Sequence, residues 1–172
     1  MAGEEWSVEI GREGPLVEED ARPEEAVFAA AREALEDLAE LLRREAAERA
    51  PRGATGHLRG SIAASVRGRA LDSLEGEVGT PAAYAPAVEF GRRPGGPMPP
   101  WRAGSALFRW VRGTLGAGGR EAERVSFRVA RAIGRRGIPG RHIFRDALAG
   151  SLGRIEERLR RLGLEIARAL GG

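Results

Sequence analysis

Residues 23–49, which read PEEAVFAAAREALEDLAELLRREAAER, carry the clearest structural signal in the sequence. Apolar side chains recur in this stretch at steps of three and four, at Val27, Phe28, Ala31, Leu35, Leu38, Leu42 and Ala46. This spacing places them on one face of an amphipathic helix. Pro23 suits the first turn of that helix, and Pro51 and Gly53 end it. At 1.5 Å per residue, the predicted helix is about 40 Å long.

The residues before this helix predict a short strand. Apolar and polar side chains alternate in residues 5–10, which is typical of a half-buried strand, and residues 15–17 predict a second short strand. We therefore interpret residues 1–22 as an N-terminal strand or arm. This acidic segment has no apolar stretch of the kind found in a signal peptide, so we expect no secretory leader.

The residues after the helix predict an antiparallel sheet. Three short extended pieces lie at 62–69, 74–79 and 84–90, and residues 71–73 predict a hairpin connection between the first two. We expect these strands to form a meander with one face against the long helix. The following segment, GRRPGGPMPP, has four prolines and three glycines and predicts an exposed loop.

The second half of the chain predicts helices. Two short helices are expected at 104–115 and 120–134, separated by a glycine-rich break. A last helix is expected at 144–170. Its apolar face is formed by Leu148, Leu152, Ile155, Leu159, Leu162 and Ile166.

The predicted fold class is α+β. A long N-terminal helix packs on a small antiparallel β-sheet (meander), followed by an inserted α-hairpin and a C-terminal helix. We expect one domain over residues 1–172. Its parts are the arm (1–22), the long helix (23–50), the meander with its Pro/Gly loop (51–100), the inserted helical pair (101–140) and the C-terminal helix (141–172).

The composition argues against several classes of protein. The chain has 172 residues, of which 42% are hydrophobic, so it can form a core. It has no cysteine and two histidines, which argues against disulfides, thiol catalysis and a metal site. Because it has no lysine, the glycine-rich stretch 113–119 cannot be a Walker A loop. We expect no enzyme activity, no cofactor, no small-molecule substrate and no membrane span.

All 28 basic residues are arginine, and asparagine and glutamine are absent as well. This composition fits a protein of a thermophilic host, and it equally fits a GC-rich genome. Residues 1–50 hold 15 acids and 6 arginines, whereas residues 51–172 hold 10 acids and 22 arginines. Such asymmetry indicates a DNA-facing end, complementary faces between subunits, or two ordinary solvated surfaces.

Residues 47–91 contain four motifs in a fixed order, namely AERAP (47–51), TGHLRGSI (55–62), VGT (78–80) and YAPAVEFG (84–91). In this order they resemble the HK97 gp10-like family of tailed-phage head–tail junction and tail-completion proteins. The motif residues are Pro51, Thr55, Gly56, Leu58, Ser61, Ile62, Tyr84, Val88, Glu89, Phe90 and Gly91. The tetrapeptide RHIF (141–144) resembles the family's step into a C-terminal helix, with isoleucine where proline is common.

The motif residues have structural roles that follow from their chemistry. Gly56 can take a positive φ where the chain leaves the helix, and Thr55 can hydrogen-bond the local backbone. We expect Leu58 and Ile62 to anchor the first strand against the long helix.

The motif at 84–91 is expected to be a strand. Tyr84, Val88 and Phe90 share strand parity and would pack on one face. Glu89 would then face the other way, toward water or a neighbouring subunit. Of the motif residues, only Glu89 and the loop after it are expected to be free to meet a partner.

The resemblance implies a virion structural protein that forms a ring at the top of the tail and joins the tail to the head-side neck. It implies homo-oligomers in the assembled ring, other neck and tail proteins as partners, and assembly in the host cytoplasm. A head-to-tail ring needs two different, complementary surfaces on each subunit. DNA must pass the lumen of such a ring, and the densest arginine cluster is a candidate to face that DNA or the acids of the next subunit. It comprises Arg131, Arg135, Arg136 and Arg141.

An alternative function is an arginine-rich nucleic-acid-binding module. The sequence shows no helix-turn-helix or RNA-recognition signature, and its aromatic residues are too few for a base-stacking platform. The head–tail joining role therefore remains the first hypothesis.

Overall fold

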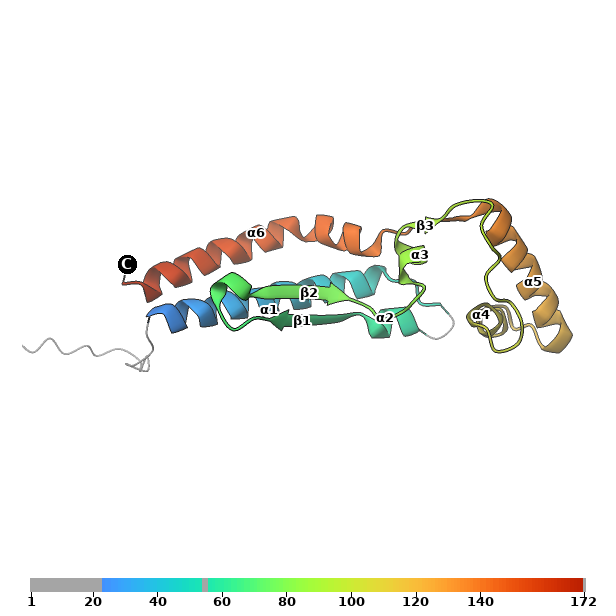
Figure 1. The fold of residues 1–172 in the computed structure, drawn as a ribbon, viewed down its shortest axis with the longest axis horizontal. Coiled ribbons are helices and arrows are strands. Elements are labelled where there is room, and N and C mark those ends of the chain that lie inside the picture. The colour runs from blue at the N-terminus through green and yellow to red at the C-terminus, as the bar shows by residue number, and fades with distance from the viewer. Residues whose placement is uncertain (1–22, 54–55, 172) are drawn as a thin grey trace, which may run out of the picture.

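The computed structural model describes residues 23–53 and 56–171. The strands predicted at 5–10 and 15–17, and the motif residue Thr55, lie outside these described residues. The described part of the chain is an elongated α+β structure built along two long helices (Figure 1). The predicted fold class is confirmed.

Helix α1 (Pro23–Arg49) has the predicted bounds, and α6 (Ile143–Ala169) runs antiparallel beside it (Figure 1). Small side chains let the two helices approach closely, because Ala46 of α1 and Ala147 of α6 are buried in the same cluster. Two ion pairs cross this interface. Arg158 Nε lies 2.8 Å from Asp37 Oδ2, and Arg154 pairs with Glu45.

The sheet beside α1 is a hairpin of β1 (Ala63–Arg67) and β2 (Glu75–Gly79). The strands are antiparallel, with Ala63 opposite Gly79, and the short 3₁₀ turn η1 (Leu71–Ser73) joins them as predicted. The hairpin packs closely on α1 because Gly76 has no side chain. A Cβ at this position would lie 3.0 Å from Leu35 Cγ.

The prediction of a third strand at 84–90 is wrong. This stretch forms the short helix α3 (Ala85–Glu89), so the hairpin is a two-stranded sheet. Pro86 explains the difference, since proline cannot donate to a strand ladder but its fixed φ suits the first turn of a helix. The carbonyl of Tyr84 accepts the backbone N–H groups of Ala87 and Val88 instead.

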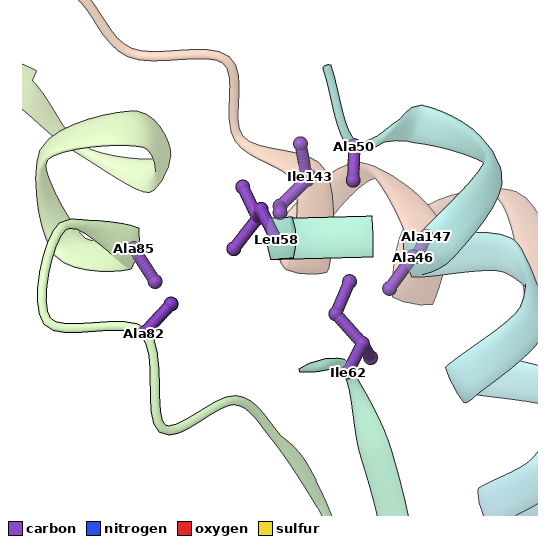
Figure 2. Packing of buried hydrophobic residues seen from close by; sticks show 8 residues of the cluster. All are labelled: Ala46, Ala50, Leu58, Ile62, Ala82, Ala85, Ile143 and Ala147. Atoms are coloured by element: carbon purple, nitrogen blue, oxygen red, sulfur yellow. The ribbon is translucent and has the colours of Figure 1, made fainter. Parts of the chain in front are cut away.

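The main core lies where one end of α1 meets α2 (His57–Ser61), α3 and the start of α6 (Figure 2). Its buried members are Ala46, Ala50, Leu58, Ile62, Ala82, Ala85, Ile143 and Ala147. Leu58 and Ile62 are buried as expected. However, Leu58 belongs to α2, and only Ile62 leads directly into β1.

The predicted helical pair is also present, as α4 (Ala106–Leu115) and α5 (Gly119–Arg136). It has its own small core around Val111, Ala117 and Ala122 and lies beyond one end of the α1–α6 pair (Figure 1). We call residues 92–141, which include this pair, the extension. It begins and ends at a short antiparallel ladder of β3 (Gly91–Arg92) with β4 (Ile138–Pro139).

We predict that Glu45 makes the contact between α1 and α6 sensitive to acid. Hydrogen bonds from Arg154, and then from Arg49, hold the pKa of the Glu45 carboxyl below its usual value. Because the folded pKa is depressed, this stabilisation is present above the ordinary glutamate pKa and is lost as the pH falls through the lowered value. In Glu45→Gln, the melting temperature should be lower than in the wild type at about pH 6, and this gap should close toward about pH 3.

Thermal melts followed by circular dichroism would measure the gap. Glu48→Gln is the matched control, because Glu48 is exposed on the same helix and has no ion pair among the described residues. A gap that stays constant with pH would contradict the prediction.

Candidate assembly surfaces

The motif residue Glu89 caps the last helix. Its side chain is 6% exposed, and its carboxylate accepts the backbone N–H of Phe144 at 3.0 Å and that of Arg145 at 3.2 Å. These donors lie in the first turn of α6, whose N–H groups have no partner within the helix and whose dipole favours a negative charge. Glu89 therefore fixes the start of α6, although the two lie 55 residues apart in the sequence.

The backbone around Glu89 adds to this contact. The carbonyls of Val88 and Glu89 accept the N–H groups of Arg141 at 2.7 Å and His142 at 3.1 Å. The expectation that Glu89 faces water or a neighbouring subunit is wrong. It assumed the parity of a strand, whereas the residue ends a helix and its carboxylate is held by the N-terminus of α6.

The aromatic residues of the same motif do not pack as expected. Phe90 is 77% exposed and Tyr84 is 44% exposed, while Val88 packs against the main core. Residues 85–89 form a helix, and a helix separates side chains that a strand would place on one face. Phe90 is thus an exposed aromatic side chain beside the start of the extension.

The remaining motif residues have structural positions. Gly56 has φ +64°, as expected for the turn out of α1, and the Ser61 hydroxyl lies 2.7 Å from Thr80 Oγ1. Gly91 has φ +78°, and a Cβ there would lie 2.4 Å from the carbonyl oxygen of Ile138. Only glycine fits where β3 crosses β4. Pro51 follows α1 and is half-buried.

An apolar groove of about 410 Å³ runs between β2 and α6, and α1 forms its floor. We call it the leucine groove. It is lined by Leu35, Leu38, Ala39 and Leu42 of α1, by Gly76 and Val78 of β2, and by Phe144, Ala147, Leu148 and Ile155 of α6.

The apolar face predicted for α6 is only partly covered. The residues that α6 buries are small, namely Ala147 and Ser151 besides Ile143. The larger side chains Leu148, Leu152 and Leu159 are each about half exposed, at 48%, 52% and 50%. They lie on one face of α6, beside the face that contacts α1. An open apolar surface of this kind is typical of a protein interface.

A line of arginines covers the outer face of α5. We call it the arginine stripe, and it consists of Arg120, Arg124, Arg128, Arg131 and Arg135. The steps of four, four, three and four residues keep these side chains on one face over about 22 Å. All five are exposed, and the buried residues of α5, such as Ala122, Ser126 and Ala130, lie on the opposite face.

The structure unites only part of the predicted arginine cluster. Arg131 and Arg135 lie in the stripe, whereas Arg136 lies off this face and Arg141 lies in the segment before α6. Arg120, Arg124 and Arg128 lie outside the cluster predicted from the sequence. Their spacing was the signal that could have identified them.

The extension differs from the rest of the molecule in how its arginines are paired. It contains 12 arginines and two glutamates. None of these arginines forms an ion pair with the described residues, whereas Arg32, Arg43 and Arg49 of α1 pair with glutamates three or four residues away. The guanidinium of Arg102 lies 5.3 Å from the Trp101 ring, and Arg92 donates to the carbonyl of Pro97. The extension is therefore a strongly cationic surface, in which twelve arginines outnumber two glutamates.

Within residues 23–53 and 56–171, no group of three or more acidic or histidine side chains could hold a metal ion. No helix in the described part of the chain is long and apolar enough to cross a membrane.

Residues 20–91 match the model of a family described as "Bacteriophage HK97-gp10, putative tail-component". This confirms the resemblance expected from the sequence, and the matched range includes every motif residue from Pro51 to Gly91. It ends before the extension and α6, so the RHIF step lies outside it. No curated protein and no solved structure matches the chain significantly. Over residues 20–91 the chain thus resembles a structural component of a phage tail.

We predict that Glu89→Gln destabilises the protein by about 2 kcal/mol, because it replaces two charge-assisted hydrogen bonds and removes the charge from the N-terminus of α6. Chemical denaturation would measure the loss. Glu48→Gln should change stability by less than about 0.5 kcal/mol, as exposed substitutions usually do. Equal stability of the two variants would refute the role of Glu89 as a cap.

Proposed function

We propose that this protein is a structural subunit of a tailed-bacteriophage virion that completes the tail and joins it to the head-side neck. The observation that carries this proposal is the match of residues 20–91 to a phage tail-component family. That range contains α1, α2, the β1–β2 hairpin and α3, and it includes the Glu89 cap. The proposed work is docking, and it requires no chemical reaction.

We further propose that the subunits form a ring in the virion and that the whole chain, 1–172, acts as one domain. A closed ring is built from head-to-tail contacts between two different surfaces of the same subunit. The leucine groove is our candidate for one of these two surfaces. We propose that a neighbouring copy of this chain covers it, with the exposed aromatic side chain of Phe90 as the complementary element. Burial of half-exposed leucines and a largely exposed phenylalanine would stabilise such a contact.

Deletion of the gene from its phage or prophage tests the joining role. We expect lysates to contain DNA-filled heads beside separate, full-length tails, as seen by electron microscopy. Expression of the protein from a plasmid should restore joined particles. Normal, infectious particles without the gene would refute the proposal.

A pair of substitutions tests the leucine groove. Leu148→Gln, at a residue that lines the groove, combined with Leu152→Gln on the same face of α6, should leave the melting temperature nearly unchanged, because each side chain is already about half exposed. The double variant should nevertheless fail to restore joined particles to the deletion strain, since it makes the groove edge polar.

The matched control is Glu156→Gln with Arg160→Gln. These residues are exposed on the same helix and have no ion pair among the described residues. The control should restore joining fully. If the leucine variant restores joined particles fully, the groove is excluded as an interface. If the leucine variant fails to restore joined particles but still self-associates, the groove binds another neck protein instead of a second copy of this chain.

A further inference from the structure

We infer that the arginine stripe of α5 binds the phosphate backbone of duplex DNA without reading its sequence. The inference names a partner for one surface of the proposed joining subunit. The place of that contact in a virion rests on the proposed function, but the binding itself is a property of the isolated chain.

The geometry of the stripe fits a linear polyanion. Five arginines recur along one face of α5 at axial intervals of about 4.5–6 Å, over a total of about 22 Å. Duplex DNA carries one charge for every 1.7 Å of its axis when both strands are counted, so about 13 phosphates surround this length, and part of them faces the helix. A helix face of this length can therefore contact several phosphates at once.

The stripe is electrostatically unfavourable without such a partner. Each of its arginines has another arginine three or four residues away, and like charges at this spacing destabilise a helix. No carboxylate of the described residues pairs with any of the five. On α1 and α6, by contrast, several arginines pair with a carboxylate of their own helix, as in Arg32–Glu36 and Arg161–Glu157. An external anion would reduce the repulsion along the stripe.

The composition of this face favours DNA over an acidic protein. Protein interfaces have an apolar or aromatic centre, whereas the five stripe residues are all arginine, and Trp101, Glu123 and Phe127 border them beside Arg120 and Arg124. Phe127, which borders the stripe, packs edge-on against Trp101 at 5.1 Å between ring centroids. This pairing competes with stacking on bases, which favours a duplex over a single strand.

The contact is expected to be independent of sequence. Arginines that lie along a helix and contact phosphates contribute affinity and salt dependence but no base preference.

The test measures binding of the full-length protein to a fluorescent duplex of about 30 base pairs and arbitrary sequence, at salt concentrations from about 20 to about 200 mM. Five phosphate contacts predict a slope of log affinity against log salt of about −4.5, which is a loss of about 500-fold between 50 and 200 mM. Duplexes of unrelated sequence should bind equally.

The decisive variant replaces all five stripe arginines with glutamine. We expect its affinity at about 50 mM salt to fall by more than about 100-fold and the magnitude of its salt slope to fall by about 4.5. The matched control removes five arginines that have no ion pair among the described residues, namely Arg52, Arg59, Arg69, Arg160 and Arg168. Its affinity should change far less than that of the stripe variant. Replacement of the stripe by five lysines should retain binding, because lysine still contacts phosphate as a point charge.

Absence of binding by the wild type at about 20 mM salt would overturn the inference, and so would equal losses in the stripe variant and its control. If the wild type does not bind DNA and the glutamine variant loses self-association in sedimentation, the stripe is a protein interface instead. These outcomes are separate from the deletion experiment, which tests the joining role without reference to DNA.

Discussion

The carboxylate of Glu89 at the N-terminus of α6 is the contact on which the arrangement of the other elements depends. Glu89 lies two residues before the end of the range that matches the phage family, and its carboxylate holds the first residues of the last helix. From that fixed start, α6 returns along α1 and forms the second wall of the leucine groove. The β3–β4 ladder follows directly, so the same few residues also hold both ends of the extension. A charged side chain is well suited to this task, because it satisfies two otherwise unpaired N–H groups in a buried position.

Much of the fold could be predicted from local periodicity. The bounds of α1 agree with the repeat of apolar residues, and the helical pair and α6 lie within a few residues of their predicted positions. The third strand could not be found in this way, because Pro86 changes the structure of a segment whose apolar pattern also suits a strand. The role of Glu89 was equally hidden, since its partners lie 55 and 56 residues away and leave no local pattern.

The candidate surfaces were partly visible in the sequence. Helical spacing identifies the leucines of α6 as an apolar face, but it does not tell which neighbour covers them, and in the structure α1 covers mainly the small residues beside them. Likewise, the spacing of the stripe could have been read from the sequence. The lack of ion pairs could not, because pairing depends on which acids the fold brings near. The two surfaces lie on different parts of the molecule, so an apolar contact and an ionic contact can form at the same time (Figure 1).

The ladder between β3 and β4 also has a consequence for the extension. Arg92 and Ile138 are paired directly across it, so the two ends of the helical insert are adjacent in space although 46 positions separate them in sequence. A tight turn between paired strands can replace an insert of any length. The α4–α5 pair can therefore be replaced by a shorter or longer segment without moving α1, α6 or the Glu89 cap. The reach and the charge of the extension are in this sense independent of the body that carries it.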